Sequence, residues 1–265
     1  MRRRIGAMIA VDWFSLKLKV YLQYKAYIAV WLISGFGPLV TMLVWVGIVN
    51  NNRQSAASND LYAYFAIAYL TKQLTTIWVS DELCRMIRDS DITLRVTRPC
   101  WPFWEFGAGH MAGTVIRLGP ACAVTLAILL GTGSWKALDL QRIPTYLLAL
   151  SLSWTIQFAS GWLIGSIGFW IREVKPFVIA YSTCIAIGGG LYAPLSLLPT
   201  NLRGITEFLP FASTVGDPVA LLVPTLATHS QVTSLVTAGW WSTVTVCAAV
   251  GIWRLGARRI GVIHS

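Results

Sequence analysis

The sequence predicts an all-α integral membrane protein with six transmembrane helices in a single domain that covers residues 1–265. Composition and pattern both support this fold class. Hydrophobic residues make up 55% of the chain and charged residues 12%, about half of the roughly 25% found in soluble domains. The apolar residues form long continuous runs rather than the alternating pattern of barrel strands, and in lipid such runs satisfy their backbone as helices.

Six of these runs approach the roughly 20 apolar residues that a helix needs to cross a bilayer. They cover residues 26–49, 61–79, 104–130, 146–171, 177–198 and 232–255. The chain starts with basic residues, but the first apolar run is too long for a cleavable signal peptide. We therefore expect this first run to remain as an anchor.

Basic residues lie mainly in the connections on one side of the predicted membrane. That side carries Arg2, Arg3, Arg4, Lys17, Lys19, Lys25, Arg85, Arg88, Arg95, Arg98, Arg172, Lys175, Arg254, Arg258 and Arg259, and the other carries Arg53, Lys136, Arg142 and Arg203. The positive-inside rule then predicts that both termini are cytoplasmic. Because topology accounts for the net charge of +10, no nucleic-acid partner is expected.

Two segments beside the spans have mixed character. Residues 1–25 place polar and apolar side chains on opposite helical faces, which fits either a helix along the inner leaflet or a simple basic tail. Residues 199–228 are too polar and proline-rich for a span and too apolar for a free loop. They fit either short re-entrant helices at the outer interface or an ordered outer loop. The glycine triplet at 188–190 predicts a broken outer end of the fifth span.

Residues 81–102 form the one long polar stretch of the chain, between the second and third predicted spans. Leu83, Ile87 and Leu94 recur at helical spacing, and charged residues occupy the other faces. This pattern predicts a cytoplasmic surface helix that ends near Arg98–Pro99. Either a contact surface for a soluble partner or a solvated loop that only sets topology would explain it.

Two sequence blocks resemble a branch of the ABC-2-type ABC transporter permease family. "MIRDSDITLRVTRP" is similar to its pattern IR-x-G-[DE]-L-x-x-x-L-x-RP through Ile87, Arg88, Asp91, Ile92, Arg98 and Pro99, with Ser90 in place of the glycine and Val96 in place of a leucine. "GLYAPLSLLPTNLRGITEFLPFAS" is similar to its G-x-x-x-P-L-x-x-x-P-x-x-L segment, followed by L-P-F, through Pro194, Leu195, Pro199, Leu202, Leu209, Pro210 and Phe211. The blocks cover under a fifth of the chain, and their order agrees with the six-span layout.

The resemblance implies a permease subunit in the inner membrane of a prokaryote. It implies a homo- or heterodimer with a second permease chain, surrounded by membrane lipids and driven by two ABC ATPase subunits that bind ATP and magnesium. No cofactor is then expected on this chain. Residues 81–102 would be the coupling helix that enters the ATPase, with contacts from Asp81, Glu82, Arg85, Arg88, Asp91, Arg98 and Pro99.

Missing motifs narrow the function further. No G-x-x-x-x-G-K-[ST] occurs, so the chain has no phosphate-binding loop of its own. No acid is expected at depth within the spans, and Glu105 and Glu173 are expected at solvent-accessible edges, which argues against ion-coupled transport. No catalytic or metal-binding residue is expected, because the three histidines are isolated and the serine in "GSIG" at 165–168 has no partner base. The glycines at 161 and 165 instead fit close helix packing.

Two cations and two tryptophans within the spans are candidates for a translocation path. A cation at mid-bilayer costs from roughly 3 to more than 10 kcal/mol. Lys72 lies close enough to the inner end of its span to reach the headgroups, whereas Arg117 needs either a wet path with an anionic partner or backbone carbonyls. Trp45 and Trp162 would either line a path for an apolar substrate or pack against lipid and helices.

The leading hypothesis is therefore a non-catalytic permease subunit of an ABC exporter, which forms the path for an amphipathic or lipid-like substrate. The alternative is a standalone membrane scaffold or a lipid-modifying membrane enzyme. An associated ATPase distinguishes the two.

Overall fold

The computed structural model describes residues 15–16, 18–20, 23, 30, 33, 35–51, 55–89 and 102–259. Throughout these residues the chain is helical or connects helices, and no strand occurs among them. The predicted all-α class is therefore confirmed for the described part of the chain. Most of the predicted N-terminal helix and residues 90–101 of the predicted coupling segment lie outside it.

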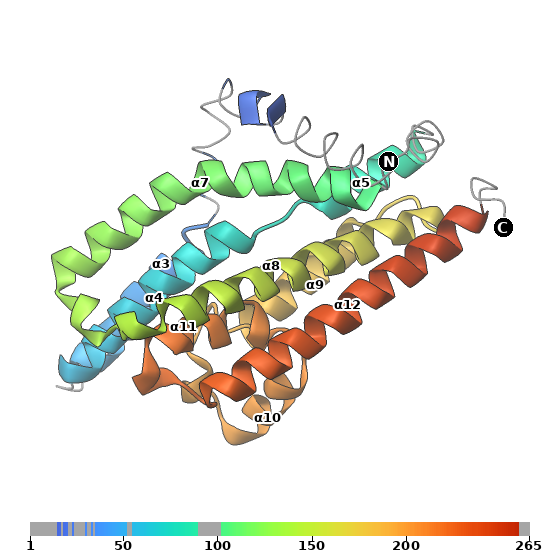
Figure 1. Cartoon of the computed structure of the whole chain (residues 1–265). Helices are drawn as coiled ribbons and strands as arrows, with labels where there is room; N and C mark the ends of the chain where they lie inside the picture. Colours follow the sequence, from blue (N-terminus) through green and yellow to red (C-terminus); the bar gives the residue numbers. More distant parts are fainter. Residues whose placement is uncertain are drawn as a thin grey trace.

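In the described part of the chain, three helices are long and apolar enough to cross a membrane. They are α7 (Pro102–Thr132), the unit of η2 (Leu140–Arg142), α8 (Ile143–Ser166) and η3 (Ile167–Phe169), and α12 (Gln231–Arg259). At 1.5 Å per residue, the 31 residues of α7 span about 46 Å, which exceeds the roughly 30 Å of a hydrocarbon core. The three helices run along the length of the molecule (Figure 1).

The other predicted spans correspond to shorter or less apolar helices: α3 (Gly37–Asn51), α4 (Ser55–Thr75) and α9 (Lys175–Gly188). α9 ends ten residues before the predicted bound of 198. The reason is the glycine triplet, in which Gly190 adopts φ +77 and turns the chain away from the helix axis. Tyr64 Oη donates a hydrogen bond to the Gly190 carbonyl at 2.8 Å, so α4 holds this turn in place.

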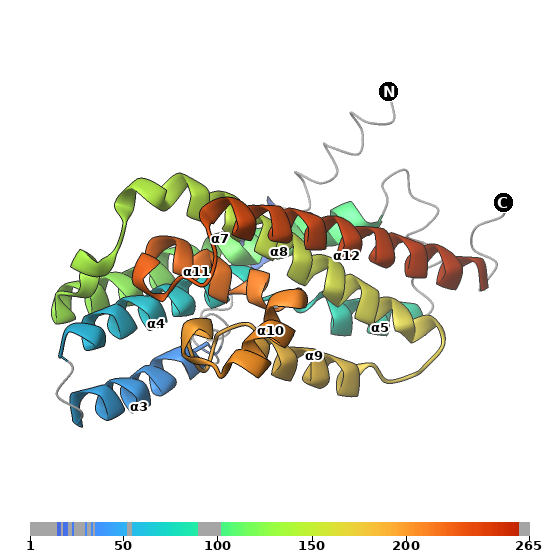
Figure 2. The same cartoon turned by 90° about the horizontal axis from the view of Figure 1, so that it is seen from below.

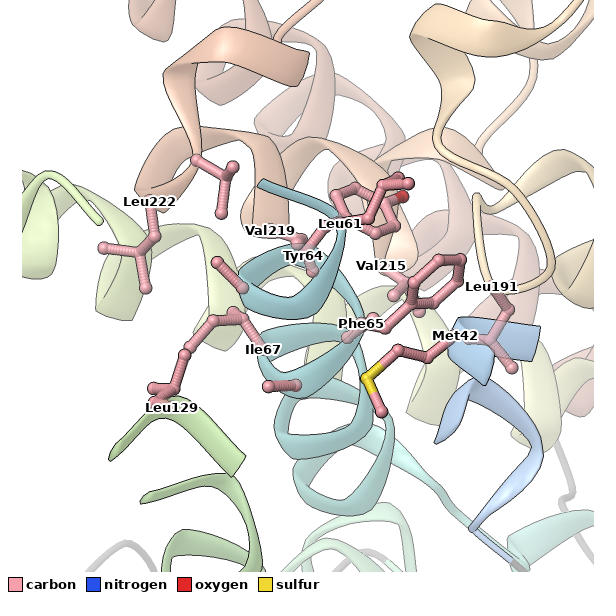
Figure 3. Packing of buried hydrophobic residues seen from close by; sticks show 14 of the residues in the cluster. Met42, Leu61, Tyr64, Phe65, Ile67, Leu129, Leu191, Val215, Val219 and Leu222 are labelled. Atoms are coloured by element: carbon pink, nitrogen blue, oxygen red, sulfur yellow. The ribbon is translucent and has the colours of Figure 1, made fainter. Parts of the chain in front are cut away.

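α4 is the central helix of the bundle. Its residues from Leu61 to Thr75 are almost all buried, because α3, α7, α8 and α11 (Gly216–Leu222) pack around it. Figure 3 shows Tyr64, Phe65 and Ile67 directed toward different neighbours within this core. The polar residues of α4 are therefore covered by neighbouring helices.

The second predicted span, 61–79, is not one continuous helix. α4 ends at Thr75, residues 76–78 are not helical, and α5 (Val79–Arg88) begins after them. Thr76 closes the end of α4, since its backbone N–H and its hydroxyl both donate to the Lys72 carbonyl, at 3.0 and 2.6 Å. α5 lies beyond α4 along the length of the molecule (Figure 1 and Figure 2).

The predicted outer segment, 199–228, contains short helices. α10 (Thr200–Phe208), η5 (Ala212–Thr214), α11 and η6 (Pro224–Leu226) follow one another between α9 and α12. α11 packs against α8 and α4, and the Asp139 N–H donates to the Leu222 carbonyl at 2.9 Å. The segment is therefore integrated with the helix bundle.

The two ends of the bundle differ in charge. The end that carries α5, the start of α9 and the end of α12 lies opposite the end with α11 (Figure 1). The first end gathers Arg85, Arg88, Arg172, Lys175, Arg254, Arg258 and Arg259, and the opposite end carries Lys136, Arg142 and Arg203. The fold thus brings together basic residues that are far apart in the sequence.

Candidate functional site

α5 is an amphipathic helix fixed to the basic end of the bundle. Val79, Leu83 and Ile87 are buried among α7, α8 and α12, as the spacing of Leu83 and Ile87 predicts. Arg85 and Arg88 lie on its exposed face. The helix thus joins an apolar packing face to a charged outer face.

A row of glycines on α8 creates the groove that receives α5. A methyl group at Gly161 would lie 2.8 Å from Val79 Cγ1, and one at Gly165 would lie 2.9 Å from Leu83 Cβ and 3.0 Å from the Ser80 carbonyl oxygen. A side chain at either position would force α5 or its side chains to shift. The interpretation of this pattern as a packing motif is confirmed, and sequence alone did not identify α5 as the partner.

The serine beside these glycines is engaged in the helix. Ser166 is buried, and its hydroxyl donates to the Trp162 carbonyl at 2.8 Å. This bond within one turn of α8 is the ordinary arrangement for a serine in a membrane helix.

Further contacts hold α5 in place. Glu82 Oε2 lies 3.5 Å from His110 Nε2 on α7, and Cys84 Sγ donates to the Arg172 carbonyl at 3.8 Å. Burial raises the pKa of the Cys84 thiol. The inner face of α5 is therefore tied to α7, to α8 and to the loop before α9.

The predicted coupling residues fall into three groups. Arg85 and Arg88 are exposed, and Arg88 Nε lies 3.7 Å from Asp89 Oδ1. Asp81 and Glu82 are partly buried on the side of α5 that faces the bundle. Asp91, Arg98 and Pro99 lie outside the described residues.

A cavity of about 200 Å³ adjoins the break between α4 and α5, since Thr76, Ile77 and Trp78 line it. Its polar lining brings together residues from α4, the break, α5, α7, α8 and α9: Lys72, Gln73, Thr76, Ser80, Asp81, Arg117, Gln157, Tyr181 and Ser182. Ile77, Ile164, Val178 and Ile185 supply part of its apolar wall. Both cations predicted for a translocation path thus line one cavity, and we call it the cation-lined cavity.

Arg117 is held by backbone groups. Its side chain is buried, Nη2 donates to the Thr76 carbonyl at 3.0 Å, and Nε donates to the Gly113 carbonyl at 3.2 Å. Of the two accounts offered for this residue, the backbone-carbonyl partner is therefore present, and the residue also borders the cavity. Arg117 fixes the break, because Thr76 lies just beyond the end of α4.

Lys72 lies in the last turn of α4 and is half-buried at the cavity wall. Among the described residues, its ammonium group makes no hydrogen bond or salt bridge. The acid that lines the same cavity is Asp81, in the first turn of α5. The described residues of the cavity lining therefore include two cationic side chains and one acidic side chain.

A buried polar network runs from this cavity between α4 and α8. Gln157 Nε2 donates to Thr75 Oγ1 at 2.6 Å, and the Thr71 hydroxyl is 2.9 Å from the Tyr146 hydroxyl. Sequence reasoning missed these residues. The available signal was the spacing of Thr71 and Thr75, which places both hydroxyls on one face of a predicted span.

The two candidate tryptophans do not line the cavity. Trp162 is fully buried, with ring centroids 5.2 Å from Phe103 and 4.9 Å from Trp253. Trp45 Nε1 donates to the Tyr192 carbonyl at 2.8 Å and joins α3 to the turn after α9. In this chain both make internal packing contacts.

One expectation about acids is wrong. Glu105 was expected to be solvent-accessible, but its side chain in the first turn of α7 is only 3% exposed. Asp217 in α11 is also buried and accepts a hydrogen bond from the Ser213 hydroxyl at 3.2 Å. The burial of both residues therefore removes the absence of buried acids as a reason against ion-coupled transport.

Comparison of the sequence with protein-family models and with curated proteins finds no match. The residues and their geometry therefore carry the functional argument. In the described part of the chain, no cluster of histidine, cysteine and acidic residues could hold a metal ion.

Proposed function

We propose that the chain is the transmembrane permease subunit of an ATP-driven ABC exporter. The observation that carries this proposal is α5, whose apolar face is packed into the glycine groove of α8 while Arg85 and Arg88 face outward. A force applied to the outer face passes to α8 through these close contacts. The break at residues 76–78 interrupts the helix between α4 and α5, so a movement of α5 need not be transmitted along α4.

The proposed partners are two ABC ATPase subunits, which bind ATP and magnesium, and a second permease chain. Mixed charges on an exposed helix give directional contact with a soluble protein. The basic end of the bundle is assigned to the cytoplasm of a prokaryotic cell by the positive-inside rule, with both termini on that side. ATP-driven closure of the ATPases would then switch the permease pair between inward- and outward-open states.

The substrate path is assigned to the cation-lined cavity and its polar network. Apolar and polar groups share this lining, which suits an amphipathic or lipid-like substrate. Lys72 and Arg117 both belong to the lining, so they stay path candidates. Trp45 and Trp162 contribute to the path only through the packing of the helices that surround it.

Charge reversal on α5 tests the coupling proposal. Arg88→Glu should change the free energy of unfolding by no more than about 0.5 kcal/mol, since the side chain lies on the surface. The same substitution should reduce co-purification with the ATPase and abolish ATP-driven transport. Lys136→Glu is the matched control, because Lys136 is exposed at the opposite end of the bundle.

Two results would contradict the proposal. One is recovery of the chain from native membranes without any ATPase, together with normal transport by the Arg88→Glu variant, as a standalone scaffold would behave. The other is transport by the isolated chain in proteoliposomes that is driven by a proton or sodium gradient alone.

A further inference from the structure

Among the described residues that line it, the cation-lined cavity has an excess of positive charge. Lys72 and Arg117 are cationic, whereas Asp81 is acidic. The first turn of α5 adds the positive end of its helix dipole. The like charges of Lys72 and Arg117 repel each other, so an anion bound in the cavity stabilises both. The electrostatic balance of the cavity therefore favours an anionic ligand.

The two cations have different roles. Arg117 already donates to the carbonyls of Thr76 and Gly113, so its position is fixed. Lys72 carries three N–H donors and makes no side-chain hydrogen bond among the described residues. Lys72 is therefore the group that is able to bind a ligand directly, while Arg117 shapes the wall and contributes its charge.

The volume sets the size of the ligand. About 200 Å³ is more than ten times the roughly 10–15 Å³ that one water requires, but lies below the roughly 300 Å³ at which sites for drug-sized molecules begin. A compact polar head fits this space, and a whole lipid does not. Ile164, Val178 and Ile185 in the lining offer contact to the apolar part adjoining such a head.

We propose that the cation-lined cavity binds a compact phosphate-type oxyanion, with Lys72 as its direct charge partner. The side chains of Gln157, Ser80 and Ser182 supply further polar groups around the anion. The oxyanion is either the phosphate head of a lipid or free phosphate. This binding site deepens the proposed function. It rests on that function only where the bound oxyanion is identified as the transport substrate.

Binding to the purified full chain in detergent, without ATPase, tests the assignment. The probes are short-chain phosphatidic acid, the matching diacylglycerol without phosphate, and inorganic phosphate, each titrated by calorimetry. Phosphatidic acid should bind saturably and diacylglycerol should not. Binding of inorganic phosphate with similar affinity identifies free phosphate as the ligand, and binding of phosphatidic acid alone identifies the lipid head.

Three variants separate a direct role from a structural one. Lys72→Gln should weaken binding about tenfold or more, because a charge-assisted hydrogen bond is lost. Asp81→Asn should tighten binding, since it removes a repulsive carboxylate, and damage to the fold cannot produce that change. Lys175→Gln is the matched control at an exposed site of the same end and should bind like the unchanged chain.

The assignment is overturned if neither phosphate probe binds saturably, or if Lys72→Gln binds as tightly as Lys175→Gln. It is also overturned if Asp81→Asn binds more weakly than the unchanged chain. Normal binding combined with absent ATP-driven transport would remove the proposed transport function and leave this site intact. Normal ATP-driven transport combined with absent binding would remove this binding site and leave the proposed transport function intact.

Discussion

Gly165→Ala directly tests the close packing between α5 and α8. The new methyl group would lie 2.9 Å from Leu83 Cβ and 3.0 Å from the Ser80 carbonyl oxygen, and neither atom can rotate away. Overpacking of this kind typically costs about 1–3 kcal/mol. The substitution also brings a gain of up to about 1 kcal/mol, because alanine favours the helix more than glycine does.

Gly239→Ala isolates the steric part of this cost. Gly239 lies inside α12, and nothing lies within 4 Å of a methyl group added there. Since both variants gain the same helix preference, the difference between them should equal the overpacking cost of about 1–3 kcal/mol. The direction of the expected difference is a less stable Gly165→Ala chain.

Unfolding of both variants in detergent, followed by circular dichroism, measures this difference. In the complete transporter, Gly165→Ala should also lower ATP-driven transport more than Gly239→Ala, because α5 is displaced from its groove. Equal stability of the two variants would refute the packing argument. Equal transport with unequal stability would refute the role of α5 as the coupling element.

Three further predictions follow from single side chains. Arg117→Gln should lower the free energy of unfolding by about 1.5–3 kcal/mol, as measured by chemical denaturation, because the charged donor to the Thr76 carbonyl is lost; an unchanged value would rule out the bond's contribution. Trp162→Ala should cost about 3–5 kcal/mol by the same measurement, since it empties a fully buried site, and a cost below 1 kcal/mol would indicate an open path instead. The raised pKa of the Cys84 thiol leaves less thiolate at neutral pH. In a background without other cysteines, Cys84 should therefore react with maleimide more slowly than an exposed cysteine introduced by Arg85→Cys. The difference between the two rates should decrease as the pH rises through the pKa of Cys84. Equal rates at neutral pH would contradict the burial of this face of α5.

Sequence reasoning succeeded where the decisive interactions are local. The buried positions of α5, such as Leu83 and Ile87, follow from helical spacing, and the close-packed role of Gly161 and Gly165 follows from their four-residue repeat. It failed for Glu105, which was expected to face solvent. The pattern around that residue does not reveal that neighbouring helices cover the start of α7.

The cation-lined cavity shows the same division. Lys72 and Arg117 were recognised as costly charges because the sequence alone shows a cation within an apolar run. Their meeting in one cavity with Gln157 was not predictable, since these side chains come from three different helices. The break after Thr75 was also missed, because hydropathy continues through residues 76–79 without interruption.

The amino-acid sequence by itself determined the helical class, the apolar runs and the separation of basic from apolar segments. These features depend on the composition of each segment and on its preference for lipid or water. Only the tertiary structure decided which helix fills the groove of α8, that α4 is the central helix, and that the two cations share a cavity. Those outcomes depend on contacts between segments distant in the chain, and the free energy of such contacts is set by shape and burial rather than by the local order of residues.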